Sequence, residues 1–206
     1  MKKIFKRVSV AVIVLAVVVT AVVFDVPGKI IAAAADHTNH AECGDASCTE
    51  HSAISDWTGI SDLSGLETGK NYYLTDDVQL TNAVGISGDI TLCLNGYNIT
   101  AASSKRVFYV YSGNSLTLCD CKGTGKLTGG NSANGVVYVY SGTFTMYGGT
   151  ISGNTYSSNG GGVYVYNKGT FTMYGGTISD NNITGSYNAG GGVYVNGSGS
   201  TFKMYG

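Results

Sequence analysis

The sequence has little charge and almost no proline. Only 12% of its 206 residues are charged, and it contains one proline and one tryptophan. A disordered chain would need low hydrophobicity together with a high net charge. Here 43% of the residues are hydrophobic and the formal net charge is −1. The composition therefore excludes a disordered tail.

Clusters of charge are missing as well. Residues 36–206 hold seven Lys or Arg and twelve Asp or Glu, without a basic run, so nucleic acid is not an expected partner. After residue 102 the only acids are Asp120 and Asp180, which lie 60 residues apart. Polysaccharide-cleaving sites need grouped carboxylates for acid–base chemistry or calcium binding. A catalytic centre within this part of the chain is therefore not expected.

The chain begins with a pattern typical of targeting. Four basic residues fall within the first seven positions, an apolar run covers 8–24, and alanines occupy 32–35. This layout predicts a secretory signal peptide over residues 1–35. The apolar run is also marginally long enough for an uncleaved membrane anchor. In either case we expect residues 36–206 to be secreted or displayed at the cell surface.

A phrase rich in Gly, Thr, Val and Tyr recurs through the rest of the chain. Residues 161–181 read GGVYVYNKGTFTMYGGTISDN, and further copies occupy 135–154, 191–206, 107–130 and 86–100. Each copy contains three short β-phrases, and stacking such units buries a core that no single unit can bury. The sequence predicts an all-β fold: a right-handed parallel β-helix of about five coils of 26–31 residues, with three short strands per coil. An antiparallel β-sandwich is the alternative, because its turns recur at similar spacing.

Alternation along each β-phrase separates core from surface. In residues 161–181 we expect the core to receive Val163, Val165, Phe171, Met173 and Ile178. Tyrosines take the outward positions in most copies, and they are the candidate binding residues. They are Tyr109, Tyr138, Tyr164 and Tyr194 in one row, and Tyr111, Tyr140 and Tyr166 in a second. Stacked rings stabilise one another, and such rows could also form a platform for sugar rings or a protein partner.

The phrases GGVYV, FTMYGGTISGN, TLCLNGYNIT and SLTLCDCKGTGKLTGG carry a family resemblance. They resemble the right-handed β-helix repeats of large secreted or surface-attached proteins from anaerobic, gut-type Gram-positive bacteria, which belong broadly to the pectin-lyase-like superfamily. The resemblance covers about residues 57–206 and is more specific for fold than for function. Because such proteins are usually much longer, it implies that this chain is truncated within its fifth copy.

Histidine and cysteine gather before the repeats. All three histidines and two of the five cysteines lie between residues 37 and 51. The candidate ligands of a Cys2His2 zinc site are His40, Cys43, Cys48 and His51. A Cys43–Cys48 disulfide, favoured in an oxidising compartment, and a plain polar spacer are the alternatives. The other three cysteines are expected to be structural, with Cys93 stacked on Cys119 of the next coil, as a ladder of thiols or with one disulfide.

These features divide the chain into four expected segments. They are a signal peptide at 1–35, a His/Cys-containing leader at 36–56, an N-terminal cap at 57–85 and β-helix repeats at 86–206. The expected function is a non-catalytic extracellular or cell-surface scaffold for adhesion that binds a host or bacterial glycan or a surface protein, with no cofactor besides the candidate zinc. The open C-terminal end should favour self-association. The alternative is a fragment of a pectin-lyase-like polysaccharide lyase or glycoside hydrolase whose active site lies outside this segment.

Overall fold

The computed structural model describes residues 30–32, 57–131, 134–157, 160–184 and 190–205. Within these ranges all the regular structure is β-strand. No helix in this part of the chain is long and apolar enough to cross a membrane.

The strands form three sheets around one core. Sheet 1 contains β5 (Val84–Ile86), β8 (Phe108–Val110), β11 (Val137–Tyr140), β15 (Val163–Tyr166) and β19 (Val193–Asn196). Sheet 2 contains β2 (Trp57–Ile60), β3 (Lys70–Leu74), β6 (Asp89–Cys93), β9 (Ser115–Cys119), β12 (Thr143–Met146), β16 (Thr170–Met173) and β20 (Thr201–Met204). Sheet 3 contains β4 (Val78–Gln79), β7 (Asn98–Thr100), β10 (Lys126–Thr128), β13 (Thr150–Ser152), β17 (Gly176–Ser179) and β1 (Ile30–Ala32).

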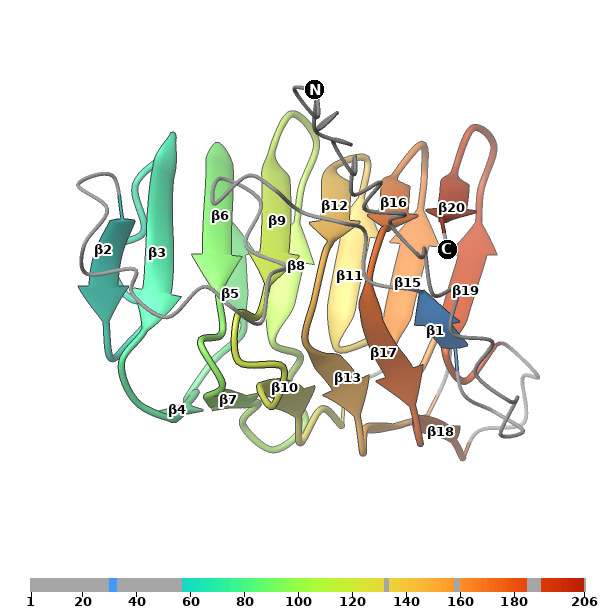
Figure 1. Cartoon of the computed structure of the whole chain (residues 1–206). Coiled ribbons are helices and arrows are strands. Elements are labelled where there is room, and N and C mark those ends of the chain that lie inside the picture. Colours follow the sequence, from blue (N-terminus) through green and yellow to red (C-terminus); the bar gives the residue numbers. More distant parts are fainter. Residues whose placement is uncertain (1–29, 33–56, 132–133, 158–159, 185–189, 206) are drawn as a thin grey trace, which may run out of the picture.

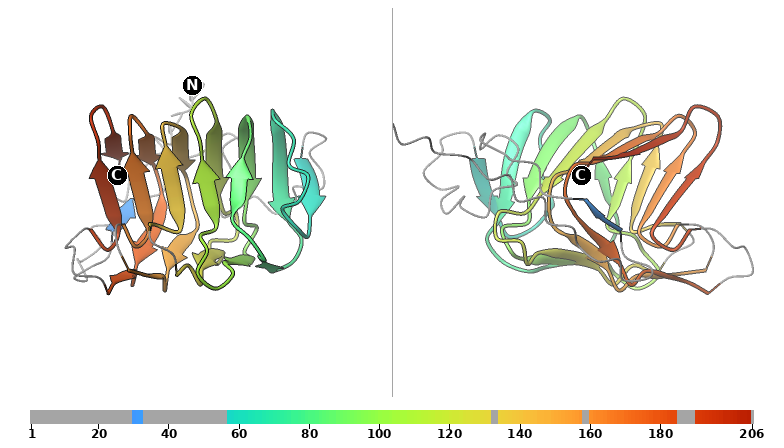
Figure 2. Two further views of the ribbon diagram at one scale, coloured as in Figure 1. Left: turned by 180° about the vertical axis from the view of Figure 1, so that it is seen from behind. Right: turned by 45° about the vertical axis from the view of Figure 1, so that its right-hand side comes forward.

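The chain passes through sheets 1, 2 and 3 once per coil. Among the described residues four coils are complete, β5–β7, β8–β10, β11–β13 and β15–β17, and β19 and β20 belong to a fifth. Neighbouring coils pair in parallel, which places each strand beside its counterpart in the next copy (Figures 1 and 2). The fold is a parallel β-solenoid, consistent with the predicted right-handed β-helix, and not an antiparallel sandwich.

The core is a stack of like side chains. Phe144 pairs in register with Phe171, and Phe171 with Phe202. Phe144 and Phe171 are fully buried, with ring centroids 4.8 Å apart. All five inward residues predicted for the coil at 161–181 are buried, as expected. Burying one such side chain contributes about 1.5–3 kcal/mol, and each coil obtains that burial from its neighbours.

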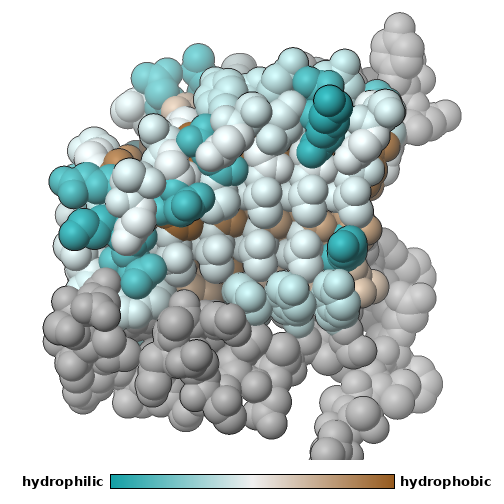
Figure 3. Space-filling view, turned by 90° about the horizontal axis from the view of Figure 1, so that it is seen from above, coloured by the Kyte–Doolittle hydropathy of each residue, from teal (hydrophilic) through white to brown (hydrophobic). Residues whose placement is uncertain are grey.

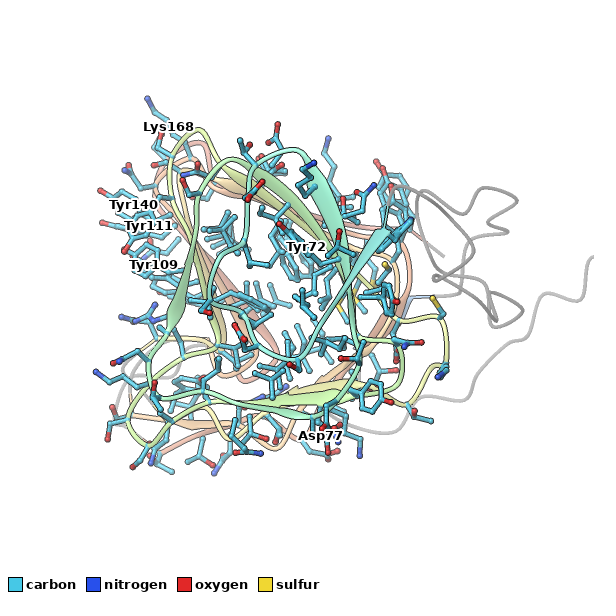
Figure 4. All side chains as sticks on the ribbon, turned by 90° about the vertical axis from the view of Figure 1, so that its left-hand side faces the viewer. Tyr72, Asp77, Tyr109, Tyr111, Tyr140 and Lys168 are labelled. Atoms are coloured by element: carbon cyan, nitrogen blue, oxygen red, sulfur yellow. The ribbon has the colours of Figure 1, made fainter. Side chains whose placement is uncertain are left out.

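The same stacking orders the surface. Seen from above in Figure 3, outward side chains form regular rows along the axis of the solenoid. Along that axis, Figure 4 shows side chains filling the interior, Tyr72 among them, while others project outward from each sheet.

The N-terminal part of the described chain continues sheet 2. β2 and β3 add two strands in the segment expected to cap the repeats. The loop after β2 inserts Leu63 into the hydrophobic core, and Leu66 packs against it. The three residues of β1 pair antiparallel with β17. The rest of the predicted signal peptide lies outside the described residues.

A small fourth sheet lies where the repeat pattern predicts only a linker. β14 (Thr155–Tyr156) pairs in parallel with β18 (Asn182–Ile183). The preceding Asn154 is buried, accepts a hydrogen bond from the Gly130 amide at 2.9 Å, and donates to Asn181 Oδ1 at 2.8 Å. These bonds join consecutive coils and hold Tyr156 in a fully buried position.

Candidate functional site

The seven candidate tyrosines lie together on the outer side of sheet 1. The strand register aligns Tyr109, Tyr138, Tyr164 and Tyr194 in one row, and Tyr140 with Tyr166 in the second. We call the set Tyr109, Tyr111, Tyr138, Tyr140, Tyr164, Tyr166 and Tyr194 the tyrosine face. Figure 4 shows Tyr109, Tyr111 and Tyr140 projecting away from the core on one side of the molecule.

The rings of the tyrosine face form a continuous network. Tyr138 and Tyr164 are nearly parallel, at 8°, with centroids 4.9 Å apart, and Tyr164 stacks on Tyr194 at 5.2 Å. Tyr109 stacks on Tyr111 at 3.8 Å and meets Tyr138 edge-on at 4.8 Å.

In this network most ring faces are covered by neighbouring rings. Tyr138 and Tyr164 are buried even though they lie on the outer side of the sheet, whereas Tyr111 is 46% exposed. The tyrosine face therefore offers a ligand mainly ring edges and hydroxyl groups. Tyr111 is the member whose ring is open to solvent.

Arg106 packs against the tyrosine face from the turn before β8. Its guanidinium carbon lies 5.1 Å from the ring centroid of Tyr109 and 4.8 Å from that of Tyr138, which are cation–π distances. Nη1 of Arg106 is buried and has no hydrogen-bond partner in the described part of the chain. Burial lowers the pKa of this guanidinium, but arginine has a reference pKa above about 12 and keeps its charge.

Burial also acts on the tyrosine hydroxyls. It raises the pKa values of Tyr109, Tyr138 and Tyr164 above the ordinary tyrosine value, because a phenolate in these positions would be poorly solvated. Electrostatic repulsion from neighbouring tyrosines raises these pKa values further, while the charge of Arg106 opposes the shift at Tyr109 and Tyr138. The three hydroxyls are therefore uncharged at physiological pH and can both donate and accept hydrogen bonds.

The charges nearest the tyrosine face are positive. The described strands of sheet 1, taken with the two residues before and after each strand, include Arg106 and Lys168 and no Asp or Glu. Lys168 lies on the same side of the molecule as the labelled tyrosines in Figure 4. An anionic ligand would meet no carboxylate along these strands.

The two acids after residue 102, Asp120 and Asp180, have different environments. Asp120 is buried in the turn after β9, where Oδ1 accepts a hydrogen bond from the Gly96 amide and Oδ2 from the Gly125 amide, each at 2.7 Å. Burial raises the pKa of this carboxyl, and the backbone amides oppose the shift. Asp180 is exposed and follows β17 with a φ of 53°. Asp120 therefore joins the turn of its own coil to that of the preceding coil, whereas Asp180 lies at the exposed end of a strand.

The cysteines of the repeats are packed together. Cys93 pairs in register with Cys119, as predicted, and its Sγ lies 3.1 Å from Sγ of Cys121. The three are buried in a cluster with Trp57. Cys121 is disulfide-bonded, which the sequence did not predict.

The leader candidates His40, Cys43, Cys48 and His51 lie outside the described residues, so the zinc site and the Cys43–Cys48 disulfide stay predictions. Across the ranges that are described, no group of three or more His, Cys, Asp or Glu could hold a metal ion.

Sequence reasoning missed Arg106 and Tyr156. Arg106 belongs to no motif, although it precedes the first tyrosine of the row by three positions. Tyr156 had a usable signal, because Tyr156 and its strand partner Ile183 each follow an asparagine, Asn154 or Asn181, by two positions. Two apolar residues in matching places indicate a further inward position.

Comparison with known proteins identified no relative of this chain. A scan against protein-family models found no matching family, and searches of curated proteins and of solved structures found no match. The resemblance to pectin-lyase-like proteins stays an expectation, and the structure itself establishes a parallel β-solenoid built from sequence repeats.

Proposed function

We propose that the protein is a non-catalytic extracellular or cell-surface scaffold whose tyrosine face binds a glycan. The observation that carries this proposal is the alignment of tyrosines from four successive coils on one side of sheet 1. Coils stack about 4.8 Å apart, so the tyrosine positions repeat along the axis, although the rings are not all parallel. A row of tyrosines repeated coil by coil suits a ligand that is itself a repeating polymer.

The packing of the rings decides how such a ligand is held. Because most ring faces stack on one another, hydroxyl groups and ring edges make the contacts, and Tyr111 is the residue able to stack on a sugar ring. The predicted signal peptide would place this surface outside the cell, where it could serve adhesion.

The enzymatic alternative gains no support from the described residues. Backbone amides already engage both carboxylate oxygens of Asp120, the one buried acid of the described chain. A lyase or hydrolase activity would need its site elsewhere.

A glycan array tests the proposal with the full chain and two variants. The first variant changes Tyr140, Tyr166 and Tyr194 to Phe, which keeps the rings and removes three hydroxyls of the tyrosine face. The matched control changes Tyr147 and Tyr174 to Phe, since these tyrosines also stack, at 4.9 Å, but follow strands of sheet 2. We expect the first variant to lose about tenfold or more in affinity and the control to bind as wild type. Equal binding by all three proteins would contradict the proposal.

A further inference from the structure

We infer that the ligand of the tyrosine face is acidic and that Arg106 binds a carboxylate or sulfate group on it. This inference rests on the proposed function, because it concerns the same face. It adds the charge of the ligand and names the residue that selects for it.

Arg106 carries a charge for which the described residues supply no counter-ion. The rings of Tyr109 and Tyr138 lie 5.1 and 4.8 Å from the guanidinium carbon. They attract the cation, but their faces do not replace the five N–H hydrogen bonds that a guanidinium can donate. Nη1 is enclosed without an acceptor, while the side chain as a whole is partly exposed. A ligand lying along the tyrosine row can therefore reach the exposed part of this side chain, whereas Nη1 itself is not open to solvent.

A second polar atom near Arg106 lacks a partner. The hydroxyl of the fully buried Tyr156 has no hydrogen-bond partner in the described part of the chain. The Tyr156 phenol also interacts electrostatically with the Arg106 guanidinium. Buried polar groups without partners are rare in folded proteins. Two enclosed donors that lack an acceptor in the described residues make this neighbourhood electropositive, although neither atom is itself open to a surface ligand.

The surroundings favour an anion over a neutral group. Lys168 is the other charged residue along sheet 1, and no carboxylate competes for Arg106 there. The buried tyrosine hydroxyls stay protonated at physiological pH, so they donate hydrogen bonds to an anion without repelling it. Charge-assisted hydrogen bonds are roughly twice as strong as neutral ones.

An arginine at position 106 can bind an anion in a way that a lysine cannot. The guanidinium is a planar fork that binds carboxylate or sulfate oxygens in pairs and stacks on aromatic rings, whereas a lysine ammonium is a compact point charge. At a site that uses both properties, Arg106→Lys should replace only the charge. The structure therefore predicts that lysine does not restore selectivity for acidic ligands.

Three polymers with one backbone separate charge from sugar recognition: dextran, carboxymethyl-dextran and dextran sulfate. We expect the full chain to bind at least one charged polymer about tenfold or more tightly than dextran at low salt. The charged polymer that binds more tightly identifies carboxylate or sulfate as the preferred group. Arg106→Gln should reduce the preference to within about twofold, and Arg106→Lys should restore only part of it.

Lys122 provides the matched control. Its Nζ lies 5.9 Å from the ring centroid of Tyr97, and the side chain is exposed in a turn after β9. Lys122→Gln removes one positive charge away from the tyrosine face and should leave the preference unchanged. Equal loss in both glutamine variants, or equal binding of dextran and the charged polymers, would overturn the inference. Should Arg106→Gln fail to fold, a lysine variant that binds as wild type would overturn it as well.

The two proposals fail in different ways. A glycan array that shows binding of neutral glycans through the tyrosine face, with no preference for acidic ones, overturns the role of Arg106 and leaves the proposed function standing. An array on which the tyrosine face variant matches wild type overturns the proposed function itself.

Discussion

At the scale of single residues, the turns between strands depend on a few buried polar groups. Asp120 is the clearest case, because its two oxygens accept hydrogen bonds from amides of two neighbouring coils, those of Gly96 and Gly125. Backbone amides of Lys122 and Gly123 point to the same carboxyl. The Asp120 carboxylate thus accepts the hydrogen bonds that water would accept from these amides if they were exposed.

Asp120→Asn should destabilise the protein by about 1–3 kcal/mol. The change replaces one acceptor oxygen by an NH2 group, which then faces a backbone N–H. The control is Asp180→Asn, at an exposed position with a φ of 53° that asparagine tolerates well. Urea denaturation of both variants measures the effect. An Asp120→Asn midpoint equal to that of Asp180→Asn would show that these hydrogen bonds contribute little.

The burial of a side chain could be predicted from the sequence where the alternation and the repeat determine it. Val163 and Phe171 had to be buried, because alternation and the repeat both place them inward. The same argument predicted on which side of the sheet Tyr138 lies, but it did not predict that the side chain is buried. Contacts with Tyr109 and Tyr164 leave Tyr138 only 9% exposed. Alternation describes one strand, whereas side-chain packing depends on the coils above and below.

At the scale of the element, β5 differs from its counterparts in sheet 1. Gly85 pairs in register with Tyr109, so it occupies the row that carries tyrosine in later coils. A Cβ at Gly85 would meet only Tyr111, at 3.6 Å, which is ordinary contact. Gly130, in the turn after β10, is the opposite case, because a Cβ there would collide with the Tyr156 hydroxyl.

Gly85→Ala should therefore stabilise the protein by about 0.5–1 kcal/mol, because alanine restricts the unfolded chain and fits the strand. Gly130→Ala should destabilise it by about 1–3 kcal/mol through overpacking. Thermal unfolding of the two variants beside wild type gives the comparison. A lower melting temperature for Gly85→Ala would mean that the edge of the tyrosine face does not accept a larger residue.

The elements themselves were predictable to different degrees. The three β-phrases of each coil were evident because four or five copies repeat the same residues in the same order. β14 and β18 were not, because each has two residues, too few for a pattern of alternation. Their pairing depends on Asn154 and Asn181, which bond between coils.

At the scale of the whole molecule, buried tyrosines link stability to alkaline pH. Tyr109, Tyr138, Tyr156 and Tyr164 have pKa values raised by burial in the folded protein. In the unfolded chain tyrosine titrates near pH 10. Below that pH these tyrosines are protonated in both the folded and the unfolded state, so their contribution to stability does not change with pH. Above it the unfolded chain releases protons that the folded protein keeps, so the free energy of unfolding falls as pH rises.

We therefore expect the melting temperature to be level through the neutral range and to fall steadily above about pH 10. Phenolate absorbance should show part of the tyrosines ionising only as the chain unfolds. Titration of every tyrosine in the folded protein near its ordinary pKa would contradict the burial described for the tyrosine face.

The solenoid as a whole followed from the repeat, because only stacked coils bury the inward residues of every copy. The position of Arg106, on which the proposed selectivity depends, did not follow. The position of Arg106 over two rings arises from coils 107–130 and 135–154 together, and no single repeat encodes it.

The register between coils also limits how such a surface can evolve. Phe144 lies on Phe171 and Tyr138 on Tyr164, so residues from neighbouring coils correspond one to one. Recombination between these copies would insert or delete one whole coil and lengthen or shorten the tyrosine row by one step. An insertion of an odd number of residues within a strand would turn the core residues that follow it toward solvent. The length of the tyrosine face thus changes in steps of one coil.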